Sequence, residues 1–202
     1  MKTYPTISYR KTAGHVFVFD KLDGSNIRAE WNKNKGFFKF GRRNGLLDHS
    51  NPVLLEAPDI IMAKYADDMS QIFKKMRVRK ATAFFEFWGP NSSFGAHADE
   101  PHDCTLIDVH VHPKGILEPR EFLKHFGYLD HAALLREGPW TDELDQQVRN
   151  GTFPGMTFEG VVCKGKCVSP GKPLMFKVKN IAWLQKLRSH CGDDDKLFEK
   201  MK

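Results

Sequence analysis

A short loop that carries one lysine between two apolar segments is the feature that most constrains how this chain folds. Residues 16–19 read VFVF and lead to the loop KLDGSN at residues 21–26, after which residues 27–31 alternate between apolar and polar. The apolar run predicts a strand, and the glycine-containing loop predicts a turn. The alternation of apolar and polar residues that follows predicts a second strand. The first strand therefore delivers Lys21 to a turn between two strands.

Lys21 is a candidate nucleophile, because lysine carries the only common amine side chain in proteins. Its reference pKa of about 10.4 leaves almost all of the amine protonated at neutral pH. A lysine nucleophile therefore needs cationic neighbours, a metal ion or removal from water to release its proton. If Lys21 is a nucleophile, the rest of the chain must supply at least one of these conditions.

The composition predicts a folded, basic protein. Of 202 residues, 41% are hydrophobic and 12% are aromatic, which is typical of a globular chain rather than a disordered one. Lys and Arg number 31 against 25 for Asp and Glu, so the net charge is +6. This charge favours a polyanionic partner, but a mildly basic protein without one would have the same charge.

Cysteine usage and hydropathy predict a cytoplasmic protein, intracellular rather than secreted. The four cysteines form no CxxC pair, so reduced thiols are expected rather than a zinc knuckle or a disulfide framework. Residues 1–11 contain no apolar signal region. No stretch approaches the roughly 18 apolar residues of a membrane span, so we expect no membrane partner.

Periodicity divides the remainder of the chain into strands and helices. Further strands are predicted at residues 36–41, 82–88, 104–111, 158–164 and 173–179, with a turn-rich stretch at residues 165–172. Helices are predicted at residues 58–76, 119–126, 130–136, 141–150, 181–190 and 193–202. No repeat or linker composition separates these elements, so residues 1–202 are expected to form a single domain with a short helical tail at residues 180–202.

Conspicuous polar residues recur on or beside the apolar strands. They are Lys21 with Asn26, the pair Arg42 and Arg43, Glu86, Glu159, and the pair Lys177 and Lys179. Each one alone is most simply a solvated charge at a strand edge. Their order and sequence context together favour a common site.

In these residues the sequence resembles the covalent nucleotidyltransferases, the superfamily of polynucleotide ligases and mRNA capping enzymes, and most of all the ATP-dependent RNA ligases of the phage double-strand-repairing type. Residues 21–26 match the nucleophile motif K-x-D/H-G-S/T-N, and its final Asn is more typical of RNA ligases than of DNA ligases. Residues 85–90, FEFWGP, resemble F-G-E-x-x-G-P, and residues 106–109, LIDV, resemble an aromatic-Asp-Val strand. Residues 159–164, EGVVCK, match E-G-x-V-x-K, and residues 177–179, KVK, match the closing K-x-K.

The resemblance implies a fold and a reaction. The fold is a mixed α/β (α+β) nucleotidyltransferase core, an ATP-grasp-like ligase core of twisted antiparallel sheets with flanking helices, here without an OB-fold. The reaction is ATP-dependent RNA ligation through a covalent lysyl-AMP intermediate, with transfer of AMP to a 5′-phosphate and sealing to a 3′-hydroxyl. The cofactors implied are ATP and Mg²⁺ or Mn²⁺.

The resemblance also implies roles for individual residues. Lys21 would attack the α-phosphorus, while Lys177 and Lys179 would neutralise phosphate charge and lower the pKa of Lys21 by crowding it. Glu159 would bind the metal, because hard cations prefer carboxylate oxygen. Nucleotide contacts would come from Asp20, Leu22, Arg43, Glu86, Ile107 and Val161, and Asn26 would orient phosphate or assist sealing.

Two positions depart from the family pattern at the expected base pocket. Asp20 stands where these ligases often have the longer glutamate, and Ile107 stands where an aromatic residue usually stacks on adenine. Adenine is therefore expected to lie between aliphatic side chains, Ile107 on one side and Val161 or Val162 on the other.

The sequence after Lys179 is short, so the expected protein is a catalytic domain alone. Binding of nucleic acid, RNA rather than DNA, is expected to rely on basic residues near the site, Lys33, Lys35 and Arg42, and on an accessory protein in place of a further domain. Rival interpretations are a DNA ligase, a capping-type guanylyltransferase, and a non-catalytic nucleic-acid-binding relative. His110 and His112 share one strand face, with His97 and His102 in the preceding loop, but no third ligand at secure spacing supports a zinc site.

Overall fold

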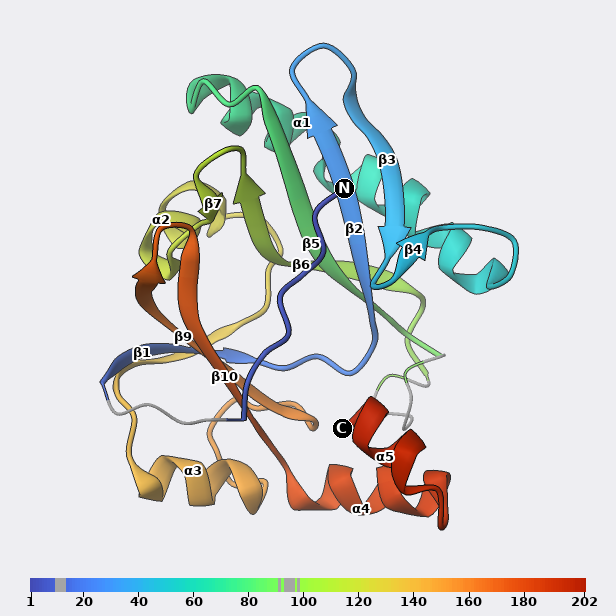
Figure 1. Cartoon of the computed structure of the whole chain (residues 1–202), viewed down its shortest axis with the longest axis vertical. Coiled ribbons are helices and arrows are strands. Elements are labelled where there is room, and N and C mark those ends of the chain that lie inside the picture. The colour runs from blue at the N-terminus through green and yellow to red at the C-terminus, as the bar shows by residue number, and fades with distance from the viewer. Residues whose placement is uncertain (10–13, 91, 93–96, 98) are drawn as a thin grey trace.

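The computed structural model, which describes residues 1–9, 14–90, 92, 97 and 99–202, contains two antiparallel sheets (Figure 1). The small sheet has the order β10-β9-β1-β8 and is formed by β1 (His15–Asp20), β8 (Leu134–Pro139), β9 (Gly160–Ser169) and β10 (Lys172–Lys179). The large sheet has the order β4-β3-β2-β5-β6-β7. Its strands are β2 (Ser25–Asn32), β3 (Gly36–Arg42), β4 (Gly45–Leu46), β5 (Lys80–Trp88), β6 (Asp103–Val111) and β7 (Gly115–Ile116).

The main core lies between the large sheet and helix α1 (Ala57–Lys75), which follows a 3-10 turn at Pro52–Glu56. Strand alternation places Ile27, Ala29 and Trp31 on the face that packs in this core. Arg28 and Glu30 point to the other face, and both are nevertheless buried. That second face is polar and is turned towards the functional site described below.

Four further helices of the described residues surround the sheets. They are α2 (Pro119–Phe126), α3 (Asp142–Arg149), α4 (Ile181–Cys191) and α5 (Asp195–Met201). Thr141 caps α3 by accepting a hydrogen bond from the Leu144 amide, as its position before two acidic residues predicts. No helix among the described residues is both long enough and apolar enough to cross a membrane.

Two sequence predictions about secondary structure are wrong. The expected helix at residues 130–136 is replaced by a bend followed by β8, which pairs antiparallel with β1. The buried strand β1 needs hydrogen-bonding partners on both edges, and this long-range requirement overrides a local helical pattern. Similarly, β9 continues to Ser169 through the stretch expected to be turns, because β10 pairs with it along that length.

The chain passes from one sheet to the other at the lysine loop. Residues 21–24 connect the end of β1 in the small sheet to the start of β2 in the large sheet. The N-terminal segment, residues 1–9, makes a second crossing in front of the sheets (Figure 1), and Ser8 forms a bridge with Phe176 of β10. Lys21 and the N-terminal segment therefore both lie where the chain passes from one sheet to the other.

Candidate active site

A pocket of about 440 Å³ lies between the two sheets and is lined by both crossing segments. It contains most of the residues that the sequence analysis singled out. These are Asp20, Lys21, Leu22, Asn26, Arg42, Arg43, Glu86, Ile107, Glu159, Lys177 and Lys179. Residues from six separate parts of the chain therefore meet in one cavity, as the motif order predicts.

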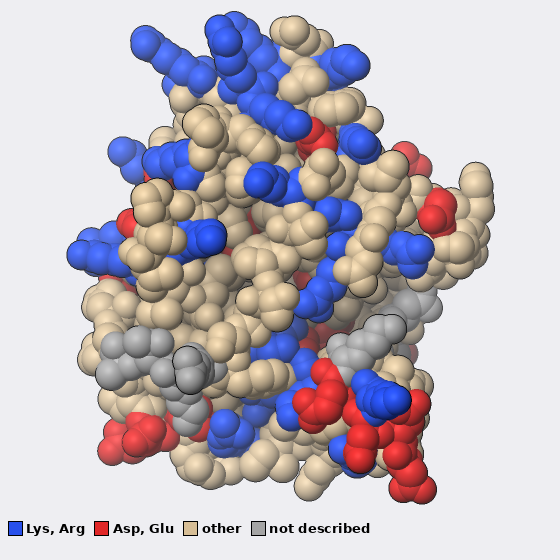
Figure 2. Space-filling model, viewed as in Figure 1, with Lys and Arg blue, Asp and Glu red and all other residues tan. Residues whose placement is uncertain are grey.

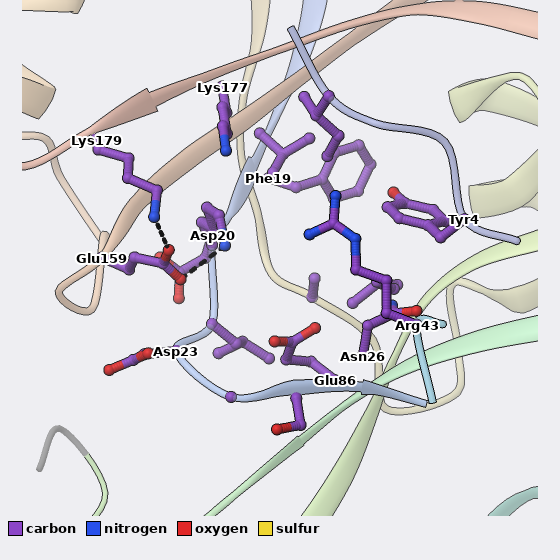
Figure 3. A pocket seen from close by; sticks show the side chains of 18 of the residues that line it. Tyr4, Phe19, Asp20, Asp23, Asn26, Arg43, Glu86, Glu159, Lys177 and Lys179 are labelled. Carbon is purple, nitrogen blue, oxygen red and sulfur yellow. Dashed lines mark hydrogen bonds and ion pairs between the residues drawn. The ribbon is translucent and has the colours of Figure 1, made fainter. Parts of the chain in front are cut away.

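Glu159 is the centre of the charged end of the pocket (Figure 3). Its Oε2 atom accepts a hydrogen bond from Lys21 Nζ at 2.7 Å, and its Oε1 atom accepts one from Lys179 Nζ at 2.6 Å. The carboxylate is buried, as is the Lys179 side chain, whose ammonium lies 3.4 Å from the ring centroid of Trp183. One carboxylate thus holds two lysine ammonium groups in a largely dry environment.

The structure corrects the expectation that crowding by lysines lowers the pKa of Lys21. Burial does act to lower this pKa, but the negative charges of Glu159, Glu86 and Asp23 and the hydrogen bond to Glu159 outweigh it. The pKa of Lys21 is consequently raised above its usual value. The ammonium form is stabilised as long as Glu159 remains its partner.

Lys177 and Lys179 are the residues whose pKa is lowered. Burial lowers the pKa of Lys177 to about 7, with further contributions from the charges of Lys179 and Lys21. Burial lowers that of Lys179 to about 8, although Glu159 opposes the change. Lys177 Nζ also donates a hydrogen bond to the carbonyl oxygen of Lys202 at 2.8 Å, so the segment after α5 reaches the same end of the pocket.

Glu86 and Asn26 face the pocket from neighbouring strands of the large sheet, where they are directly paired. Burial raises the pKa of Glu86 to about 8, and the like charges of Glu159 and Asp23 act in the same direction. The Asn26 side-chain oxygen is buried and has no hydrogen-bond partner among the described residues. Such an acceptor in a pocket is suited to a donor on a bound ligand.

Gly24 allows the lysine loop to pass close to β5. A Cβ atom at this position would lie 2.3 Å from the carbonyl oxygen of Phe87, which is closer than any side chain tolerates. The glycine in the motif therefore permits the approach that brings Lys21 over the large sheet. Any larger residue would move the loop and its lysine.

At the other end of the pocket, Ile107 and Val162 provide the aliphatic surface, while Val161 points away from it. Val161, predicted to contact the nucleotide, is therefore outside the pocket lining. Val161 and Val162 are successive residues of β9 and face opposite sides, so Val161 joins the core with Val16 and Val18. Of the two valines that the sequence left open, the pocket contains Val162.

Asp20 lines the pocket, but its carboxylate is already engaged. Oδ1 accepts a hydrogen bond from the Thr157 amide at 3.0 Å and Oδ2 accepts one from the Thr157 hydroxyl at 2.8 Å. These bonds fasten the segment that leads to Glu159 against the end of β1. The shorter acidic side chain at this position thus positions the segment before Glu159.

Two pocket residues, Tyr4 and Lys164, were not identified from the sequence. Lys164 is buried and donates to Asp108 Oδ2 at 2.8 Å and to the carbonyl oxygen of Ile107 at 2.7 Å. The Tyr4 hydroxyl donates to the same Asp108 carboxylate. The lysine at the end of the EGVVCK motif was a signal for Lys164, whereas nothing in the N-terminal sequence pointed to Tyr4.

The basic residues expected near the site have different positions. Arg42 and Arg43 both line the pocket, and the Arg43 guanidinium points into it between Tyr4 and Phe19 (Figure 3). Lys33 and Lys35 do not line it, because they occupy the tip of the β2–β3 hairpin. About seven residues of extended strand, or roughly 23 Å, separate that tip from the pocket end of the hairpin at Asn26 and Arg42.

Basic side chains cover much of the face that contains the pocket. Figure 2 shows Lys and Arg over the large-sheet half of this face and in the hollow between the sheets, whereas Asp and Glu gather along its lower edge. The hollow itself contains Lys21, Lys177 and Arg43. A polyanion would therefore meet positive charge across the large sheet as it approached the site.

Comparison with known proteins gives structural matches only. No family model matches the sequence, and no curated protein matches it. The fold is similar to an RNA ligase from Naegleria gruberi with pyrophosphate, with a TM-score of 0.62, 16% identity, and coverage of 87% of this chain and 52% of the ligase. A variant of that ligase with ATP and manganese gives a TM-score of 0.61 and 16% identity over 85% of this chain and 51% of the ligase.

The chain spans about half the length of the RNA ligase structures that it matches. The similarity covers at least 85% of this chain. It confirms the fold that the sequence motifs implied. The chain has the nucleotidyltransferase fold of RNA ligases.

Proposed function

We propose that this protein is an ATP-dependent RNA ligase that works through a covalent lysyl-AMP intermediate on Lys21. The observation that carries the proposal is the hydrogen bond between Lys21 and Glu159, with Lys177 and Lys179 in the same pocket. An amine, a carboxylate and several cations in one cavity are the groups that nucleotidyl transfer to a lysine requires. The matched ligase structures contain ATP and pyrophosphate, the substrate and the product of that first step.

In the first step the Lys21 nitrogen forms a bond to the α-phosphorus of ATP. The bond between that phosphorus and the oxygen bridging to the β-phosphate breaks, and pyrophosphate leaves with the electron pair. The ammonium loses one proton before the attack and a second, to water, as the phosphoramidate forms. Glu159, which already accepts a hydrogen bond from Lys21, is positioned to receive the first.

Positive charge stabilises the phosphate groups during this transfer. Lys177, Lys179 and Arg43 surround the space next to Lys21 and would offset the charge that develops on the leaving pyrophosphate. Burial makes these interactions stronger than they would be in water.

The residues also fit a divalent cation. No group of three His, Cys, Asp or Glu residues suited to a metal occurs within the described part of the chain. A Mg²⁺ or Mn²⁺ ion bound through one carboxylate would complete its coordination with phosphate oxygens and water, which is how Mg²⁺ usually binds nucleotides. Glu159 would hold it, and the bound ion would neutralise phosphate charge and orient the α-phosphate.

The later steps place nucleic acid beside the same pocket. AMP would move from Lys21 to a 5′-phosphate, and a 3′-hydroxyl would then displace AMP to form the phosphodiester. Basic residues on the large-sheet half of the surface would contact the phosphate backbone, with little dependence on sequence and strong dependence on salt. We propose that an accessory protein also contributes to RNA binding. We place this reaction in the cytoplasm, in accordance with the four free cysteines.

Covalent labelling tests the proposal. Purified protein is incubated with a divalent cation and α-labelled ATP, and the label retained on the protein under denaturing conditions is measured. We expect label on wild type, none on Lys21→Ala, and undiminished label on Lys186→Ala, a lysine of α4 outside the pocket lining. Wild type without label, or Lys21→Ala with label, would refute a lysyl-AMP enzyme centred on Lys21.

The same assay distinguishes the rival functions. Label from GTP instead of ATP would identify a guanylyltransferase of the capping type. Label from ATP followed by sealing of nicked DNA but not nicked RNA would identify a DNA ligase. Binding of RNA without label from any nucleotide would identify a non-catalytic relative, so each alternative has its own outcome.

A further inference from the structure

Arg28 is a buried arginine whose guanidinium bonds to two walls of the pocket without lining the pocket itself. It lies in β2 on the polar face of the large sheet and is only 5% exposed. Nε donates to the carbonyl oxygen of Arg42 at 2.9 Å, and one terminal nitrogen donates to that of Gly45 at 3.0 Å. The other terminal nitrogen donates to the carbonyl oxygen of Lys2 at 3.1 Å and to the Thr3 hydroxyl at 3.4 Å.

These acceptors belong to two segments that are far apart in sequence. Arg42 and Gly45 are the ends of the turn that contains Arg43 and Asn44, which both line the pocket. Lys2 and Thr3 precede Tyr4, which lines the pocket from the N-terminal segment. One side chain therefore connects the arginine turn to the N-terminal segment.

The hydrogen-bond acceptors of Arg28 are suited to a buried guanidinium that links two segments. All four acceptors are neutral oxygens, so the charge of the guanidinium is offset by backbone and hydroxyl dipoles. Burial lowers the pKa of Arg28 from its usual value, which reflects the cost of holding a cation in this position. Replacement by an apolar residue would leave three backbone carbonyl groups without their donor.

Gly41 provides the space for the guanidinium and for the turn. A Cβ atom at this position would lie 2.6 Å from the carbonyl oxygen of Gly45 and 3.3 Å from an Arg28 terminal nitrogen. The absence of a side chain at Gly41 therefore allows the Arg28 guanidinium to reach the carbonyl oxygens of both Arg42 and Gly45. The arrangement depends on two residues outside the matched motifs.

We propose that Arg28 is a positioning residue that holds the turn of residues 42–45 so that the Arg43 guanidinium points into the nucleotide pocket. This inference rests on the proposed function, because Arg43 acts there on phosphate. Arg28 itself does not line the pocket and would touch no reacting atom. Its effect on the reaction is transmitted by Arg43.

A double-mutant cycle tests transmission through Arg43. The apparent kcat/KM for labelling by ATP is measured for wild type, Arg28→Met, Arg43→Ala and the double variant. We expect each single variant to lose roughly tenfold to a hundredfold, since small displacements of a positioning group have effects of this order. The double variant should be no worse than Arg43→Ala alone, within about twofold.

The proposal would be overturned if the losses in kcat/KM of the two single variants multiplied in the double variant. A general structural defect would act independently of Arg43 and would give that result. An Arg28→Met variant as active as wild type would also overturn it. Arg28→Lys retains the charge but not the planar fork of donors, so it should remain impaired and show the same non-additivity. If Arg28→Met does not fold, Arg28→Lys replaces it in the test. Wild-type activity in Arg28→Lys would refute the role of the planar fork of donors.

Hydrogen exchange separates this inference from the proposed function. In Arg28→Met, or in Arg28→Lys if the former does not fold, backbone amides of residues 2–4 and 42–47 should exchange faster than in wild type, while those of α3 should not change. If wild type is not labelled by ATP but exchange increases in these two segments alone, the ligase proposal fails and the structural connection remains. If wild type is labelled and exchange in these segments is unchanged, the Arg28 inference fails and the ligase proposal remains.

Discussion

Glu159 accepts a hydrogen bond from Lys21 at 2.7 Å although 138 positions separate the two residues in the sequence. The lysine is at the end of the small-sheet strand β1, and the glutamate directly precedes β9, which pairs with β1. Strand pairing therefore brings the acid to the amine. The resulting ion pair keeps Lys21 protonated, so a proton must leave the amine before nucleophilic attack.

The first prediction concerns the reactivity of Lys21. Glu159→Gln removes the main charge that raises the pKa of Lys21, while burial continues to lower it. The midpoint of the pH profile for Lys21 modification by an amine-reactive reagent should therefore move to lower pH, as followed by mass spectrometry. Glu143→Gln, an exposed change on α3, is the control and should leave the midpoint unchanged. An upward shift in Glu159→Gln would contradict this explanation of the raised pKa.

The second prediction concerns the linkage between ATP binding and protons. With pKa values of about 7 and 8, Lys177 and Lys179 are partly neutral at pH 8. Bound phosphate favours their charged forms and raises both pKa values, so binding must take up protons. Titration calorimetry of Lys21→Ala with ATP at pH 8, in buffers of different ionisation enthalpy, should show net uptake. The affinity for ATP should also fall as the pH rises from 7 to 9. Net proton release on binding would contradict the lowered pKa values of Lys177 and Lys179.

The third prediction concerns the buried ion pair of Lys164 and Asp108, whose side chains are 5% and 2% exposed. Asp108→Asn leaves the lysine ammonium without a charged partner, which should cost about 3–5 kcal/mol in the free energy of unfolding. The double variant Asp108→Asn with Lys164→Met removes the buried charge and should recover part of that loss. Chemical denaturation measures both changes. A double variant less stable than Asp108→Asn would show that the loss arises from packing.

The fourth prediction concerns the pH dependence of stability. The pKa of Glu86 is about 8 in the folded protein, compared with about 4.3 for an exposed glutamate. Because the folded state binds more protons between these values, the contribution of Glu86 to stability decreases as the pH rises through this window. Glu86→Gln avoids that loss, so its Tm relative to wild type should increase between pH 5 and pH 9. A constant difference would mean that Glu86 does not titrate in this range.

Much of the site was predictable because its residues lie in short motifs whose chemistry is local. Lys21 in its glycine-containing loop, Glu159 beside β9 and the alternating pair Lys177 and Lys179 could each be placed on a strand or turn from neighbouring residues alone. Their order along the chain then implied a common pocket, which the structure contains.

The features that could not be predicted depend on contacts between distant segments. The strand β8 forms because β1 requires a partner, and the sequence around Leu134 does not contain that information. Which of Val161 and Val162 faces the pocket depends on the register of β9 against β1, and one residue of shift exchanges them. The raised pKa of Lys21 likewise depends on the balance of three acids from separate loops and strands.

The bond from Lys164 to Asp108 also determines how the pocket can change width. Lys164 belongs to the small sheet and Asp108 to the large sheet, so this ion pair joins the two sheets at the Ile107 end of the pocket. Widening the pocket at that end would therefore require a buried ion pair to separate. The same bond thus sets the spacing of the two pocket walls beside Ile107.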